Sequence, residues 1–139
     1  MDGRNKVARW LAGLGCVVLL ASAGLHCVAY VKFSSPAVAA SNLPAALKSV
    51  FTVAFLSMAW AWLVVAIIVW LAAFWETASR KPLILVCGFA VLLQAIFTLP
   101  FVGLFLGNEM IGAASILIIA AGFTFAPPVA GDSIGVGER

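Results

Sequence analysis

The residues of this sequence that are best able to bind a ligand or take part in a reaction are a few polar side chains inside long apolar segments. His26 is the single histidine, and Ser22 and Tyr30 flank it at intervals of four residues. Residues four apart share one face of a helix. An ionisable side chain inside a membrane is costly, and an imidazole titrates near neutral pH, so His26 is the strongest single candidate for a functional residue.

A second set of polar residues lies in the later apolar segments. Gln94 and Thr98 are four residues apart in the third segment, and Ser57 lies in the second. At about 1.5 Å of rise per residue, His26 lies roughly 9 Å below the outer end of its helix, at about the depth of Thr98 and Ser57. The sequence therefore predicts a polar layer in the outer half of the membrane that could bind a small lipophilic ligand, formed by Ser22, His26, Tyr30, Ser57, Gln94 and Thr98.

The same side chains also have a purely structural interpretation. Serine, threonine and glutamine commonly join membrane helices through hydrogen bonds, each worth about 0.6 to 2 kcal/mol. The sequence leaves both interpretations open. A cavity that reaches these side chains would favour ligand binding, and close packing around them would favour the structural role.

No group of residues indicates catalysis or a bound cofactor. A membrane cytochrome with two haems needs several axial histidines, and this chain has one histidine. Cys16 and Cys27 are eleven residues apart on one helix, about 16 Å and too far for a disulfide. A metal site needs a cluster of ligands, and Glu109 is an isolated carboxylate near the outer surface. We therefore expect no catalytic residue, no metal and no cofactor, and a non-enzymatic role is favoured over an enzymatic one.

The segments that carry these residues are membrane spans. The chain is 65% hydrophobic and 9% charged, whereas about a quarter of the residues of a soluble domain are charged. Nearly every charge falls in short clusters that are separated by four apolar stretches, each long enough to cross a hydrocarbon core of roughly 30 Å. A segment in lipid must satisfy its own backbone hydrogen bonds. The sequence thus predicts an all-α integral membrane protein with helices at about 10–31, 49–75, 83–106 and 111–130.

The basic residues predict how these helices are oriented. One side of the membrane would carry six of them, and the other side would carry Lys32 and Lys48. Because cytoplasmic loops are enriched in basic residues, the bundle should be antiparallel with both termini in the cytoplasm. Residues 1–9 would form a basic cytoplasmic start and residues 131–139 a disordered cytoplasmic tail. The net charge of +3 then reflects topology, and no nucleic-acid partner is expected. The six basic residues are Arg4, Lys6, Arg9, Arg80, Lys81 and Arg139.

Two features of the first half allow further expectations. Residues 1–23 resemble a cleavable secretory signal in their basic start, apolar core and small-residue triplet. Apolar sequence continues to Val31, however, which favours an uncleaved span. The serine- and proline-rich segment from Lys32 to Lys48 predicts a long external loop.

These observations favour a small multi-pass protein without catalytic activity, placed in a bacterial cytoplasmic (inner) membrane. Such a protein would act through lateral helix contacts, either with itself or with other membrane subunits, because little of its mass lies outside the bilayer. Faces of small residues suit such contacts. The alternative is binding, transport or conversion of a small lipophilic molecule, such as a quinone or a lipid, at the polar layer.

Overall fold

The computed structural model describes residues 3–75, 79–103 and 105–126, and the regular structure in these ranges is helical. Four helices in these ranges are long and apolar enough to cross a membrane. The sequence-based expectation of four membrane-spanning helices is therefore met in length and composition. The expected tail at 131–139 lies outside the described residues. The elements are α1 (Gly3–Ala29), the π-helical turn η1 (Tyr30–Ser34), α2 (Ser35–Ala40), α3 (Ala45–Phe74), α4 (Arg80–Val102) and α5 (Leu106–Thr124).

The helices begin before the residues expected from hydropathy. α1 begins at Gly3, α3 at Ala45, α4 at Arg80 and α5 at Leu106, where the apolar segments begin at 10, 49, 83 and 111. Apolar sequence marks only the part of a helix that lies in hydrocarbon, whereas backbone hydrogen bonds continue into the headgroup region. At the other end the expectations for α4 and α5 are too late, because α4 ends at Val102 and α5 at Thr124, whereas the apolar segments run to 106 and 130. Hydropathy therefore underestimates the length of α1 and α3 and shifts α4 and α5 along the chain.

The expected loop from 32 to 48 is shorter in the structure and needs correction. The helix of α1 continues through η1 and α2 to Ala40, and only Ser41–Pro44 separate it from α3. Pro36 lies in the first turn of α2, where a missing N–H group is tolerated. The π-helical turn before it, in which the Ser35 N–H donates to Tyr30 O, is wider than an α-helical turn. The serine- and proline-containing segment is therefore part of one continuous helical span, Gly3–Ala40.

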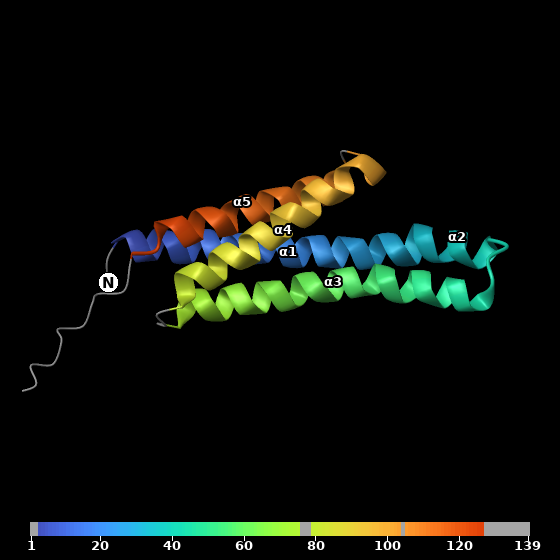
Figure 1. Ribbon diagram of the computed structural model, residues 1–139, viewed down its shortest axis with the longest axis horizontal. Coiled ribbons are helices and arrows are strands. Elements are labelled where there is room, and N and C mark those ends of the chain that lie inside the picture. Colours follow the sequence, from blue (N-terminus) through green and yellow to red (C-terminus); the bar gives the residue numbers. More distant parts are fainter. Residues whose placement is uncertain (1–2, 76–78, 104, 127–139) are drawn as a thin grey trace, which may run out of the picture.

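The four long helices form two pairs, α1–α3 and α4–α5, that diverge at one end, and α2 continues the line of α1 (Figure 1). α1 packs most extensively against α5 and α3, and α4 packs against α5, whereas α3 and α4 have the smallest contact of these four pairs. In Figure 1, α4 begins beside the end of α3 and then runs away from it with α5. The space between α3 and α4 therefore widens toward the loop that joins α2 to α3.

Small side chains bring α1 close to its two neighbours. Ala8, Ala12 and Cys16 recur every four residues on α1 and are buried. A Cβ atom added at Gly15 would lie 2.8 Å from Cγ1 of Ile118 on α5 and 3.2 Å from the Ala114 carbonyl oxygen. Only glycine permits this approach. Close backbone packing of this kind is what holds helices together where lipid competes for apolar side chains.

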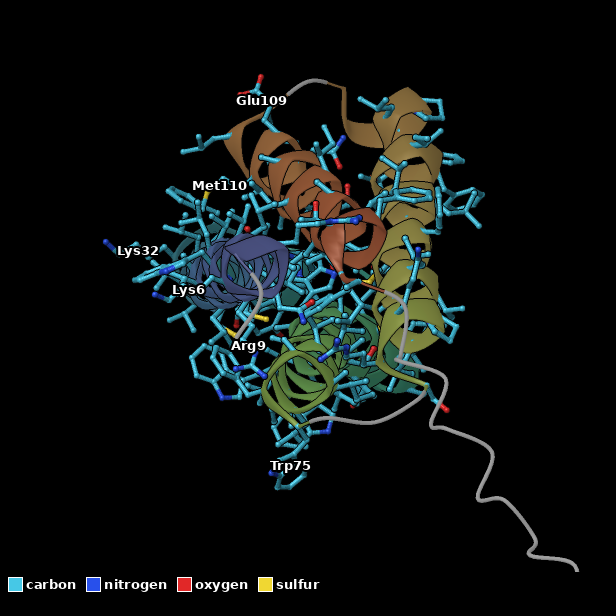
Figure 2. All side chains as sticks on the ribbon, turned by 90° about the vertical axis from the view of Figure 1, so that its left-hand side faces the viewer. Lys6, Arg9, Lys32, Trp75, Glu109 and Met110 are labelled. Carbon is cyan, nitrogen blue, oxygen red and sulfur yellow. The ribbon has the colours of Figure 1, made fainter. Side chains whose placement is uncertain are left out.

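Hydrogen bonds connect four helix ends at one end of the molecule. The Asn5 Oδ1 accepts from the Ala126 N–H at 3.1 Å and from Arg80 Nη2 at 3.5 Å. Arg9 Nε donates to the Ala73 carbonyl oxygen at 3.1 Å. The start of α1, the end of α3, the start of α4 and the chain after α5 therefore meet there. Figure 2 looks onto this end, with Lys6, Arg9 and Trp75 labelled.

Candidate binding cavity

A cavity of about 450 Å³ occupies the space between the α1–α3 pair and the α4–α5 pair. α1 contributes polar residues on its inner face, α3 contributes aromatic and sulfur-containing side chains, and α4 contributes an amide and a hydroxyl. The turn before α5 closes one side. The lining residues are Ser22, Leu25, His26, Val28, Ala29, Phe33, Phe55, Met58, Trp62, Gln94, Thr98, Phe105, Leu106, Gly107, Asn108 and Ile111.

His26 is held against α3 by a hydrogen bond and by two aromatic contacts. Its Nε2 lies 3.0 Å from the Phe55 carbonyl oxygen. The imidazole stacks on the Phe55 ring with centroids 4.0 Å apart and meets the Trp62 ring edge-on at 5.1 Å. A carbonyl oxygen can only accept a hydrogen bond, so the proton of the imidazole is on Nε2. The ring therefore has a fixed position and a defined tautomer.

Gln94 connects α4 to α3 beside this imidazole. Its Oε1 accepts a hydrogen bond from Trp62 Nε1 at 3.0 Å, and its Nε2 lies 2.8 Å from Met58 Sδ. An indole N–H is a donor only, so the atom that faces it must be the amide oxygen. The orientation of the Gln94 amide is thus determined by Trp62, which touches both His26 and Gln94.

Thr98 and Asn108 form a second polar pair, between α4 and the first turn of α5. The Thr98 hydroxyl lies 2.8 Å from Asn108 Oδ1, and Asn108 Nδ2 donates to the Ala95 carbonyl oxygen at 3.3 Å. The same hydroxyl is also near the Gln94 and Ala95 carbonyl oxygens of its own helix. Asn108 is only 5% exposed. This pair connects the two helices next to the turn that joins them.

The structure brings four of the six sequence-predicted site residues to the cavity. Ser22, His26, Gln94 and Thr98 line it. Ser22 donates to the Val18 carbonyl oxygen of its own helix at 3.0 Å. These four side chains come from α1 and α4, on opposite sides of the space.

The other two predicted site residues lie elsewhere. Ser57 is exposed on α3 and donates to the Ala54 carbonyl oxygen. Tyr30 is buried, and its hydroxyl lies 2.6 Å from Thr52 Oγ1. It lines a separate groove between η1, α2 and α3 that also includes Lys48. The prediction compared only how deep each residue lies in the membrane. Ser57 was selected for its depth, but it lies on a face of α3 that does not line the cavity.

Glu109, the isolated carboxylate expected near the outer surface, is not part of the cavity lining. Figure 2 shows its side chain at the edge of α5, pointing away from the other helices. Its neighbour Asn108 faces inward and lines the cavity. Adjacent residues of a helix point about 100° apart, which accounts for the difference.

Sequence reasoning missed the α3 and α5 residues that complete the site. Trp62, Phe55 and Met58 resemble ordinary packing residues in the sequence, because nothing in an apolar helix marks which side faces a cavity. Asn108 follows Gly107 and so is typical of an exposed turn. The weak signal for Trp62 is its polar N–H, which needs an acceptor when buried.

Among the described residues, no three histidine, cysteine or acidic side chains lie close enough together to hold a metal ion. The three cysteines are free thiols, and Cys16 Sγ donates to the Ala66 carbonyl oxygen at 3.3 Å. Cys16 and Cys87 are buried in helix contacts. Their positions suit packing between helices.

Comparison with known proteins identifies no relative of this chain: no protein-family model, curated protein or solved structure matches it. The chemistry available in the cavity follows from its own residues. The walls are mainly aliphatic and aromatic, with a fixed imidazole and a fixed amide on opposite helices. Pockets for small organic ligands commonly have this composition, with a few placed polar groups in an apolar lining.

Proposed function

We propose that this protein binds a small lipophilic molecule in the cavity between the two helix pairs. The observation that carries the proposal is the cavity itself, which reaches four of the predicted polar residues. With about 450 Å³ it falls within the range of roughly 300–1,000 Å³ that ligand pockets occupy. Close packing around these side chains would instead have favoured the purely structural role.

The apolar lining supports a ligand that comes from the membrane. Two cavity residues, Phe33 and Leu106, are 72% and 65% exposed, so the cavity reaches the surface of the protein near the divergent ends of the helix pairs. If the helices span a bilayer, that opening faces lipid or the outer headgroup region. A molecule dissolved in the membrane could then reach the cavity from the side.

The proposal includes a membrane orientation. We propose an antiparallel bundle whose hydrogen-bonded end, around Asn5, Arg9 and Arg80, lies at the cytoplasmic face of a bacterial inner membrane. Basic residues at that end support this orientation. The cavity would then lie in the outer half of the membrane, as the depth of His26 suggests.

Action through lateral contacts alone, the other function that the sequence favours, has less support. The small-residue stripe Ala8, Ala12 and Cys16 is buried within the chain, as are Ala114 and Ser115 on α5. These faces are therefore used for contacts between the protein's own helices. Association with itself or with other membrane subunits remains a second proposal.

Native mass spectrometry of the protein released from its own membranes tests ligand binding. We expect added mass of a lipid-like molecule on the wild type. Replacing Ala29 in the cavity lining by phenylalanine should fill the space and remove that mass. Replacing Ala21, which is exposed on the same helix, by phenylalanine should leave it. A wild-type spectrum without added mass, or equal added mass on both variants, would refute the proposal.

A further inference from the structure

The hydrogen bonds already made around the cavity determine which polar group a ligand must bring. His26 donates through Nε2 to the Phe55 carbonyl oxygen. In a neutral imidazole the other nitrogen, Nδ1, is then an acceptor. None of the described residues that line the cavity is acidic, so the lining offers no carboxylate as a counter-ion for a charged ring. No described side chain donates to Nδ1, and this leaves an acceptor on a residue of the cavity wall.

Gln94 offers the opposite group on the facing helix. Its oxygen accepts from Trp62, and one amide hydrogen is directed to Met58 Sδ. A side-chain amide has two hydrogens on nitrogen, and the second has no acceptor among the described residues. Because the Trp62 indole fixes the amide orientation, the amide cannot turn over and present its oxygen at this position. The open group of Gln94 is therefore a hydrogen-bond donor.

Each of the other polar side chains of the lining already makes at least one hydrogen bond. Thr98 and Asn108 bond to each other and to the Ala95 carbonyl oxygen, and the Ser22 hydroxyl donates to Val18. The second Asn108 amide hydrogen and the lone pairs of the Ser22 and Thr98 hydroxyl oxygens are also open. His26 Nδ1 and the second Gln94 amide hydrogen differ from them in being an open acceptor and an open donor on two residues that contact the same side chain. Both residues contact the Trp62 indole ring, so these two groups from different helices lie next to the same side chain of α3.

We infer that the ligand carries a hydroxyl group, which donates to His26 Nδ1 and accepts from the second amide hydrogen of Gln94. This inference rests on the proposed function and specifies its ligand class as a long-chain or isoprenoid alcohol, or a phenol with an apolar tail. A quinone, an ester or an ether has acceptor oxygens only, and these would meet the lone pair of Nδ1. The tail would lie along the aromatic and aliphatic walls and leave through the opening toward lipid.

The inference can be tested with a matched pair of probes in lipid nanodiscs. The probes are 9,10-dibromo-octadecanol and its methyl ether, in which a methyl group replaces the hydroxyl hydrogen. The bromine atoms of both probes quench tryptophan fluorescence. A variant that keeps only Trp62 reports on the cavity, because the other four tryptophans are exposed and can be replaced by phenylalanine. A variant that keeps only Trp60, which is 66% exposed, reports quenching from bulk lipid.

We expect the alcohol to quench Trp62 at a three- to tenfold lower concentration than the ether, the effect of one net hydrogen bond. Trp60 should respond equally to both probes. His26→Phe keeps an aromatic ring to stack on Phe55 but removes the acceptor, so the alcohol should lose its advantage over the ether. Wild-type protein should likewise retain more alcohol than ether in native mass spectrometry, which checks the result without any substitution.

The possible failures are distinguishable. Equal, saturable quenching of Trp62 by alcohol and ether would overturn the hydroxyl assignment and leave the proposed binding function standing. Quenching of Trp62 that does not saturate, and that matches Trp60 for both probes, would overturn both. Retention of the alcohol's advantage in His26→Phe would show that another group accepts the hydroxyl, and the assignment to Nδ1 would be wrong.

Discussion

Trp62 Nε1 donates a 3.0 Å hydrogen bond to Gln94 Oε1 and thereby joins α3 to α4 beside the cavity. These two helices make only a small contact elsewhere. The bond therefore has two consequences. It limits how far the helix pairs can separate, and it fixes the direction of the amide that a ligand would meet.

Loss of this bond should destabilise the protein. We expect Trp62→Phe to lower the free energy of unfolding by about 1 to 2 kcal/mol, because Gln94 Oε1 loses its donor in an apolar surrounding. Trp60→Phe makes the same change on the exposed face of α3 and should cost less than about 0.5 kcal/mol. Unfolding by sodium dodecyl sulfate in mixed micelles measures both. Equal losses would mean that the hydrogen bond contributes nothing.

The contact of α1 with α5 should depend on the missing side chain at Gly15. In Gly15→Ala the new Cβ would lie 2.8 Å from Ile118 Cγ1 and 3.2 Å from a backbone oxygen, so the helices must separate. Overpacking of this kind costs about 1–3 kcal/mol. Gly24→Ala is the control, because a Cβ there meets nothing within 4 Å. Thermal unfolding in detergent should show a lower midpoint for Gly15→Ala alone.

Thr98 and Asn108 should behave as a coupled pair. A double-mutant cycle with Thr98→Val and Asn108→Ala should give a coupling free energy of about 0.6–1.7 kcal/mol, the range for hydrogen bonds between membrane helices. Thr124 bonds only to a carbonyl oxygen of its own helix. Combining Thr98→Val with Thr124→Val should therefore be additive within about 0.5 kcal/mol. Additivity in the first cycle would show that the pair is not formed.

The proposed orientation predicts which positions a membrane-impermeant thiol reagent reaches. With the three native cysteines replaced by alanine, Ser41→Cys should react in intact cells, because it lies between α2 and α3 on the outer side. Gly3→Cys should react only after the cells are opened. The reverse pattern would show that the protein has the opposite orientation in the membrane. Labelling of both positions in intact cells would show that the N-terminus and the turn after α2 lie on the same, outer side, which also contradicts the proposal.

Which parts of this protein the sequence predicts depends on the physical signal involved. Long apolar segments identify membrane-spanning helices because lipid excludes unpaired backbone groups, and four such helices are found. The helix ends and the path through Pro36 depend on hydrogen bonds outside the hydrocarbon. Hydropathy carries no information about those bonds, and the expected external loop was therefore too long.

The candidate site could be predicted only where residues share a helix. The four-residue spacing places Ser22 with His26 and Gln94 with Thr98 at the same cavity. It fails for Tyr30, which has the same spacing from His26 but lies in the π-helical turn and lines a separate groove. Between helices, rotation about the helix axis decides which side chain faces inward, and depth alone does not reveal it. This is why Ser57 was selected while Trp62, which meets both His26 and Gln94, was not.

Photoaffinity labelling in membranes tests the central claim, a lipophilic molecule bound in the cavity, most directly. The probe is a fatty alcohol that carries a diazirine, and peptide mass spectrometry locates its adducts. The account predicts adducts on partly buried cavity residues such as Met58, which an excess of the unlabelled alcohol removes, beside adducts on exposed Phe97 that the competitor leaves unchanged. Adducts confined to exposed residues and insensitive to competition would contradict it.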